Sequence, residues 1–212
     1  MVVSKRTLLS AVGPAAAGLL VSAVSWASVP DPMPIHWDAS GDPNGWAPRA
    51  VGLLFTPVVG LLAAGITGWA MRRATKSDAV SSATVLGIGG FHLGLHGLIV
   101  HAALHPTEAF SITGILMLMG ALIGGLGLAM PHLKQNRWAG VRTPWTLADE
   151  VNWTLTHRFA GWSMGIAGAL SMVAAALLAP PASFWAAISV ILVGSLLPLV
   201  YSYVIHRMRR SR

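Results

Sequence analysis

The sequence predicts an all-α polytopic membrane protein with six transmembrane helices and both termini on the cytoplasmic side. Of its 212 residues, 54% are hydrophobic and only 10% are charged, whereas a soluble domain carries about 25% charged residues. The charged residues lie in short clusters between long apolar runs, as the loops of a membrane protein require. The apolar runs lack the alternation typical of a membrane β-barrel, so we expect helices.

The charged clusters define the spans in chain order. A bilayer core requires about 20 apolar residues per helix, and we expect six such helices at residues 8–29, 50–71, 81–104, 110–130, 159–179 and 182–205. Pro180 and Pro181 divide the long uncharged stretch that contains the last two spans. A signal peptide cleaved near Ala27 is the alternative for the first span, but its apolar run is longer than a usual signal core.

The basic residues predict the orientation of the chain. All of the 14 lysines and arginines except Arg49 fall on one side of this arrangement. The positive-inside rule assigns that side to the cytoplasm. The net charge of +7 therefore reflects membrane topology, and we expect no direct contact with nucleic acid. Membrane lipids are the expected partners of the basic tail at residues 207–212.

Several classes of chemistry find no support in the sequence. There are no cysteines, which excludes disulfides, thiol nucleophiles and cysteine-ligated metals. The chain contains no HExxH, GxSxG or P-loop motif, and no acidic residue lies within an apolar span. We therefore expect a protein that is not an enzyme, with no catalytic residue, no metal and no cofactor.

The outer loop at residues 30–49 is the main segment on the opposite side, and an external ligand would meet it first. It contains five prolines, which favour an extended backbone, and residues 42–45 have the composition of a tight turn. The loop combines aromatic, acidic and histidine side chains. Its candidate ligand-sensing residues are Pro34, His36, Trp37, Asp38, Gly41, Gly45 and Trp46.

The cytoplasmic segment at residues 131–158 combines tryptophans with both signs of charge. Thr146 is expected to cap a helix that lies at the membrane interface before the fifth span, with Asp149 and Glu150 in its first turn. Tryptophan and arginine side chains in such a segment have two interpretations. They anchor the segment among lipid headgroups, or they form a docking surface, and the residue types alone favour neither.

The third span carries four histidines, at positions 92, 96, 101 and 105. The first two lie one helical turn apart, as do the last two, but the two pairs face nearly opposite sides of the helix. One helix therefore does not gather four ligands around one ion. We favour a packing role over a metal or proton role, and His92 and His96 remain only weak candidates for metal ligands.

A short internal similarity suggests a second function. Residues 44–47 and 136–139 share Asn, Trp and Ala, and each segment follows the first helix of a three-helix half, on opposite sides of the membrane. This is the arrangement of an inverted repeat, which is common in transporters. Chance is the simpler explanation for three identities in a chain with nine tryptophans.

The segment from Asn136 to Gly161 contains the motif N-x-x-x-G-[IV]-R-T-P-x-T-L…W…T-H, with Gly161 four residues after the histidine. It resembles the signature of the SdpI family, bacterial membrane proteins named for immunity to a sporulation-delaying peptide toxin. Residues 34–46 resemble the outer-loop pattern of the small domain that often precedes it. The chain departs from the pattern at Gln135, where proline is expected. The motif residues are Asn136, Trp138, Gly140, Arg142, Thr143, Pro144, Thr146, Trp153, His157 and Arg158.

The resemblance implies two domains and a function. Residues 1–80 would form a two-helix domain with the outer loop 30–49, and residues 81–212 a four-helix SdpI-like domain with the cytoplasmic motif segment 131–158. The protein would act in the bacterial cytoplasmic membrane in immunity or signal transduction. It would protect against or sense an extracellular peptide toxin and dock a cytoplasmic transcriptional repressor. The alternative is a small transporter or permeability modulator, and a histidine-ligated metal or haem enzyme is the least favoured possibility.

Overall fold

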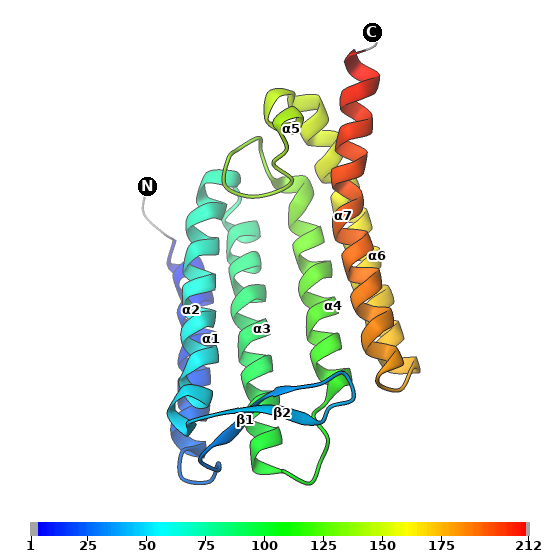
Figure 1. Ribbon diagram of the computed structural model, residues 1–212. Coiled ribbons are helices and arrows are strands. Elements are labelled where there is room, and N and C mark those ends of the chain that lie inside the picture. Colours follow the sequence, from blue (N-terminus) through cyan, green and yellow to red (C-terminus); the bar gives the residue numbers. More distant parts are fainter. Residues whose placement is uncertain (1–3, 211–212) are drawn as a thin grey trace.

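Six long helices in the computed structural model, which describes residues 4–210, confirm the predicted fold class (Figure 1). Each is long and apolar enough to cross a membrane, so the chain is a multi-pass membrane protein. Residues 211–212 of the predicted basic tail lie outside the described residues. The six helices are α1 (Lys5–Ser25), α2 (Arg49–Ala74), α3 (Asp78–Leu104), α4 (Ile112–Ala129), α6 (Glu150–Leu177) and α7 (Ala182–Arg210).

The outer loop forms an antiparallel hairpin, which its prolines did not predict. Strand β1 (Met33–Trp37) pairs with β2 (Pro43–Ala47), and the register shifts within the ladder. The turn joins Asp38 to Asp42, whose backbone groups form a hydrogen bond of 2.9 Å, so the predicted turn at residues 42–45 is wrong. Those residues instead enter β2, because Gly41 supplies the positive φ of +96° that the turn requires.

The helices form two groups of three. Helices α1, α2 and α3 pack against one another, as do α4, α6 and α7, and the contact between α3 and α4 joins the groups. Small residues allow α4 and α6 to approach closely: a Cβ atom at Gly168 would lie 2.5 Å from the carbonyl oxygen of Gly120. Such glycine contacts favour close helix packing in membranes.

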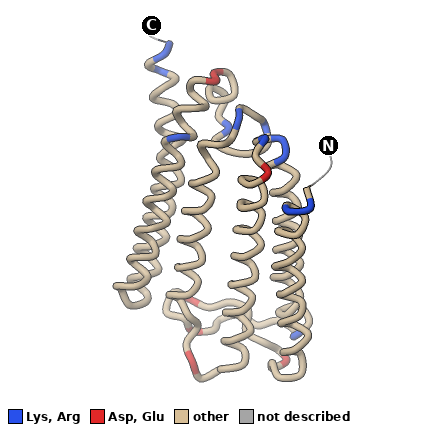
Figure 2. The backbone as a smooth tube through the Cα atoms, turned by 180° about the vertical axis from the view of Figure 1, so that it is seen from behind, with Lys and Arg blue, Asp and Glu red and all other residues tan. Residues whose placement is uncertain are grey.

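The two ends of the molecule differ in charge. Lysine and arginine residues gather at the end that carries both chain termini, while the hairpin occupies the other end (Figures 1 and 2). Arg49, at the start of α2, is the basic residue at the hairpin end. This distribution matches the arrangement that the positions of the basic residues predicted.

The connection between α4 and α6 contains two short helices, η1 (Met130–His132) and α5 (Pro144–Ala148). The predicted cap was wrong by one turn: Thr143 caps α5, and Thr146 is the third residue of that helix. Asp149 then caps α6, which continues without interruption to Leu177. The separate interfacial helix that we expected is therefore the first part of a spanning helix.

Candidate functional site

Asn136 organises the first part of the connection at residues 133–149, which we call the motif loop. Its Oδ1 atom accepts hydrogen bonds from the backbone N–H groups of Trp138 and Ala139, at 2.7 and 2.9 Å. Its Nδ2 atom donates to the carbonyl oxygens of Lys134 and Ala139. Only an amide side chain both donates and accepts in this way, so neither aspartate nor leucine would support this turn.

Gly140 and His157 fix the loop to α6. The carbonyl oxygen of Trp153 lies 2.8 Å from Nδ1 of His157, so Nδ1 carries the proton and Nε2 is free to accept. The N–H of Val141 donates to Nε2 at 3.0 Å. Gly140 has a φ of +104°, and a Cβ atom there would collide with Nε2 of His157. This glycine is therefore required both by its backbone conformation and by the close approach of the imidazole.

Trp153 forms the floor under this contact. Its ring stacks on that of His157 with centroids 3.9 Å apart, and its Nε1 atom donates to the carbonyl oxygen of Leu133 at 2.8 Å. The side chain is 1% exposed. The tryptophan therefore holds the beginning of the loop and the histidine together, which is a structural role.

A pair of threonines, of which Thr146 is buried and Thr143 half-buried, shapes the second part of the loop. Thr143 and Thr146 form a capping box, in which each side chain bonds to the backbone of the other. The hydroxyl of Thr146 also lies 2.7 Å from the carbonyl oxygen of Val141. Gln135, where the sequence pattern led us to expect proline, donates to the carbonyl oxygen of Thr146 at 2.8 Å. The departure from the pattern thus adds a bond across the loop.

Polar contacts tie the loop and α6 to α7. Asn152 donates to the carbonyl oxygen of Ser202 at 3.0 Å and accepts from the hydroxyl of Thr156 at 3.0 Å. The indole of Trp145 donates to the hydroxyl of Ser202 at 2.8 Å. Asn152 and Thr156 are fully buried, and their mutual bonds satisfy groups that would otherwise be costly among apolar helices.

Asp149 pairs with Arg209 near the end of α7, at 2.6 Å. Desolvation alone raises the pKa of Asp149, but the hydrogen bond from Arg209 and those from the N–H groups of Asn152 and Val151 lower it more. The net pKa lies below the usual value, so the cap is ionised at neutral pH. Both side chains are partly exposed, so this ion pair contributes little to stability.

The remaining motif residues are exposed. Trp138 is 46% exposed, and Arg142, Pro144 and Arg158 are exposed. Arg142 donates to the carbonyl oxygen of Arg137 at 3.0 Å, so these two residues sit together on the loop. The sequence motif therefore divides into a buried group that builds the loop and an exposed group that is available for contact.

The motif loop rests on the end of α2. The guanidinium of Arg73 lies 4.0 Å from the ring centroid of Trp69 and 5.5 Å from that of Trp138, a cation–π arrangement. The two indole rings meet edge to face at 4.6 Å. The N–H of Lys134 donates to the carbonyl oxygen of Ala74 at 2.8 Å. Trp69 and Arg73 were not among the predicted site residues, because only the fold brings α2 to this loop.

At the opposite end, the hairpin lies across α3 and α4. The ring of Trp37 stacks on that of Phe110, with centroids 4.3 Å apart, and the N–H of Phe110 donates to the carbonyl oxygen of Gly41 at 3.1 Å. Within the hairpin, Nδ1 of His36 bonds to Oδ1 of Asn44. Phe110 was also absent from the predicted site, since nothing in the sequence links it to Trp37.

Asp38 holds the hairpin turn. One carboxylate oxygen accepts from the N–H groups of Ser40, Gly41 and Asp42, and these bonds, that from Asp42 above all, lower the pKa of Asp38. A carboxylate that accepts several backbone N–H groups is favoured in its charged form. Asp38 is thus occupied with the turn. Trp46, paired with Pro34 in the ladder, is 55% exposed.

A cavity of about 430 Å³ lies beneath the hairpin. Its walls come from the hairpin, α2, α3, α4 and the first turn of α7, and most of them are apolar. Polar side chains enter only at His36, Asp38 and Thr56. The size and lining suit an apolar group of a ligand. The residues that define its shape include Ile35, Trp37, Phe55, Ile99, Phe110, Ile115 and Phe184.

The histidines of α3 have separate environments. His96 is fully buried, and its Nε2 atom bonds to the hydroxyl of Ser22 at 3.0 Å. His92 bonds to the backbone of its own helix, and the exposed rings of His101 and His105 stack at 4.3 Å. Among residues 4–210, no group of three or more His, Cys, Asp or Glu side chains is placed to hold a metal.

Comparisons with known proteins identify both parts of the predicted resemblance. Residues 132–202 match the SdpI/YfhL protein family, and residues 15–61 match a domain of unknown function, DUF1648. "Immunity protein SdpI" of Bacillus subtilis (strain 168) is 40% identical over 55 residues, which are 26% of this chain and 24% of that protein. The match therefore spans about a quarter of the relative's length. No solved structure matches the chain.

Proposed function

This chain carries the SdpI/YfhL family segment behind a DUF1648 segment, and we propose that it is an immunity and signalling protein of the bacterial cytoplasmic membrane. In this proposal the hairpin and its cavity engage a hydrophobic peptide toxin outside the cell. The motif loop carries the response on the cytoplasmic side, where it docks a regulator. The protein acts by binding and is not an enzyme.

The connection made by α2 is the observation that supports this proposal most strongly. At its beginning, Gly52 packs against the buried side chain of Met33 in the hairpin. At its end, Met71 and Ala74 share an apolar cluster with Leu133 and Trp153 of the motif region. A single helix of 26 residues therefore touches both candidate sites. A rigid element in contact with two sites is a physical route for coupling between them.

The cavity beneath the hairpin provides a binding place for the apolar part of a peptide. Its walls combine aromatic rings with aliphatic side chains, and its volume of about 430 Å³ accommodates one or two large side chains. A ligand there would contact β1 and α2 at once, because Trp37 and Phe55 both line it. A bound ligand would therefore contact α2, the helix that reaches the motif loop.

The exposed part of the motif loop is the proposed docking surface. Trp138, Arg137 and Arg142 lie together there, and tryptophan and arginine are the residues most often dominant in protein interfaces. The resemblance to SdpI suggests a transcriptional repressor as the partner. Because Trp138 also contacts the end of α2, movement of α2 would change how this surface is presented.

We propose that the end with the termini lies on the cytoplasmic side, and the basic residues that gather at this end support this orientation (Figure 2). We expect reporter fusions at Asp42 and Glu108 to be active outside the cytoplasm, and fusions at Lys76 and Gln135 to be active inside it. A cytoplasmic signal at Asp42 would overturn the orientation and the roles assigned to the two ends.

A survival assay tests the proposed immunity. The chain is expressed in Bacillus subtilis cells that lack their own SdpI protein, and these are challenged with the sporulation-delaying peptide toxin. Wild type should protect. Ile115→Trp fills the cavity, so cells that express it should be killed by at least tenfold less toxin than cells that express wild type. Cells that express Val58→Trp, on the exposed face of α2, should survive as well as those with wild type. Absence of protection by wild type at normal protein level would refute the function.

The symmetry of the helix groups favours one second candidate function. The hairpin follows the first helix of the group α1–α2–α3, and the motif loop follows the first helix of the group α4–α6–α7, at the opposite end (Figure 1). Inverted repeats of this kind occur in small transporters. Flux of ions or dyes through purified protein in liposomes, above that of empty liposomes, would support this candidate over a protein that only binds and signals.

A further inference from the structure

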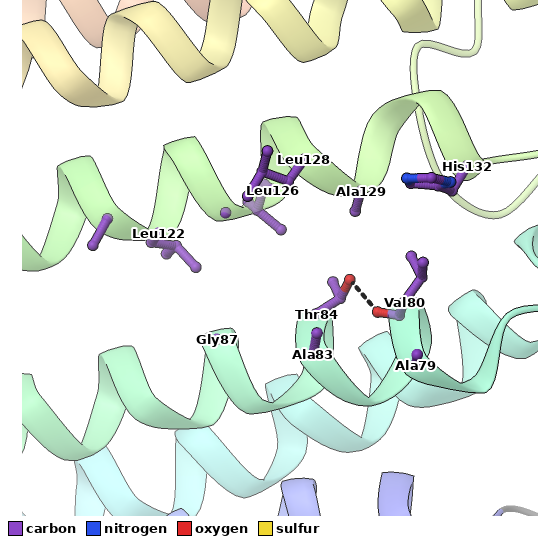
Figure 3. Close-up of a pocket in the computed structure, with 12 residues that line it drawn as sticks. Ala79, Val80, Ala83, Thr84, Gly87, Leu122, Leu126, Leu128, Ala129 and His132 are labelled. Carbon is purple, nitrogen blue, oxygen red and sulfur yellow. Dashed lines mark hydrogen bonds between the residues drawn. The ribbon is translucent and has the colours of Figure 1, made fainter.

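A second cavity, of about 370 Å³, lies between α3 and α4 near the basic end of the molecule (Figure 3). Small and aliphatic residues from both helices form its walls, with His132 at one end. The one hydroxyl in the wall, that of Thr84, donates to the carbonyl oxygen of Val80 at 2.8 Å. Apart from His132 at its end, the lining therefore offers no free polar side chain and is suited to a hydrocarbon.

This cavity is a groove that opens to the surroundings of the helices. A Cβ atom at Gly87 or Gly125 would meet nothing within 4 Å, and both glycines are exposed. Further toward the hairpin, the side chain of Leu118 contacts Gly94 and closes the space between the helices. The groove therefore begins at the basic end and stops part of the way along α3 and α4.

Positive charge lies at the open end of the groove. His132 lines the groove itself, Lys134 follows two residues later, and Lys76 precedes the first lining residue of α3. The hydrogen bond between Lys134 N–H and the carbonyl oxygen of Ala74 brings the two loops together. Both lysines are exposed, and neither forms an ion pair with any residue in the described range 4–210.

We propose that this groove binds one anionic phospholipid, with an acyl chain between α3 and α4 and the phosphate at His132, Lys76 and Lys134. Residues 121–129 of α4 extend about 12 Å at 1.5 Å per residue, and η1 adds about 6 Å at 2 Å per residue, which together match most of one acyl chain. Basic pockets between transmembrane helices on the cytoplasmic side bind anionic headgroups. The larger cavity between α6 and α7 has no lysine, arginine or histidine in its lining, so it receives lipid without this preference.

The proposal is independent of the immunity function and is tested by binding alone. Purified protein in detergent is titrated with phosphatidylglycerol or phosphatidylcholine, and lipid adducts are measured by native mass spectrometry. Wild type should retain one phosphatidylglycerol at least tenfold more strongly than phosphatidylcholine. Gly125→Leu should weaken phosphatidylglycerol retention at least tenfold, because its side chain fills the groove. Gly65→Leu, whose Cβ on α2 also meets open space, should leave it unchanged.

A second variant separates the headgroup from the chain. Lys76→Gln combined with Lys134→Gln alters only exposed side chains, so the fold should persist, and it should remove the preference for phosphatidylglycerol. Equal retention of both lipids by wild type would overturn the proposal, as would wild-type retention in Gly125→Leu. A dimer that Gly125→Leu abolishes, with no bound lipid, would assign the groove to a second copy of the chain and would also overturn it.

Discussion

Substitution of Gly140 by alanine tests how the motif loop is held. The residue has a φ of +104°, a conformation that alanine rarely adopts. Its Cβ atom would also collide with Nε2 of His157, the atom that accepts the N–H of Val141. The substitution should therefore release the loop from α6 while leaving the six helices intact.

The expected cost combines two effects. Backbone strain at such a position is of the order of 1–3 kcal/mol, and loss of the Val141–His157 hydrogen bond adds about 0.5–1.5 kcal/mol. A total of about 1.5–4.5 kcal/mol corresponds to a population of the open loop that rises roughly 10- to 1,600-fold, at about 1.4 kcal/mol per factor of ten. This change is local, because the amides concerned belong to the loop.

Hydrogen exchange measured by mass spectrometry in detergent or nanodiscs checks this prediction. Peptides covering residues 136–143 should exchange at least tenfold faster in Gly140→Ala, by roughly the factor worked out above. Gly165→Ala, in α6 and with open space around its Cβ, is the matched control, and its exchange should not increase. Exchange of the loop within threefold of wild type in Gly140→Ala would refute the role of the Gly140–His157 contact.

Further substitutions test other parts of the structure. Arg142→Lys should keep insertion and expression but reduce protection or signalling at least tenfold, because lysine lacks the planar fork needed for a two-point contact; full protection at normal protein level would return Arg142 to a headgroup anchor. His96→Ala should lower the free energy of unfolding by about 1–3 kcal/mol, because it leaves the buried hydroxyl of Ser22 without its imidazole partner. His92→Ala should also destabilise the protein, whereas the exposed His101→Ala should not. Bound metal that disappears in folded His92 and His96 variants would oppose a packing role. Asp149→Asn should lower the melting temperature at neutral pH by the equivalent of no more than about 1 kcal/mol. Because the pKa of Asp149 is lowered, the stabilisation that this carboxylate provides is complete above about pH 4 and is lost as the pH falls through the folded-state pKa. Asp149→Asn should therefore lose less stability than wild type on acidification. Equal acid sensitivity of wild type and variant would contradict this.

The helices were predictable because their signal is local. Apolar runs of membrane length and the charges between them indicate where each span lies, and the structure has all six. They do not give the helix ends, since α6 begins at Glu150, before the predicted start at residue 159. The hairpin was missed because its pairing joins Met33 to Ala47 and its fixation depends on Phe110, which lies far away in sequence. Both strands also contain prolines, which argue against strands in a sequence because proline lacks the backbone N–H group that a ladder uses.

The sequence identified the motif residues but not which of them are buried and which are exposed. Residue type marks Trp138 and Trp153 equally, yet Trp138 is 46% exposed and Trp153 is 1% exposed. The difference arises because Trp153 lies on the face of α6 that the loop covers, whereas Trp138 lies on the loop itself. The bond from Asn152 to Ser202 was likewise not predictable, since only the packing of α6 against α7 brings the two together.

We propose that a ligand under the hairpin changes the motif loop through α2. The chain contains no cysteine, so Leu147→Cys, at a position 37% exposed on α5, provides a single site for an environment-sensitive fluorophore. The labelled protein is reconstituted in liposomes with the hairpin outward, and the sporulation-delaying peptide toxin is added outside. We predict a saturable change in emission that Ile115→Trp abolishes and Val58→Trp preserves. Saturable binding of the peptide with no change in emission would contradict the account.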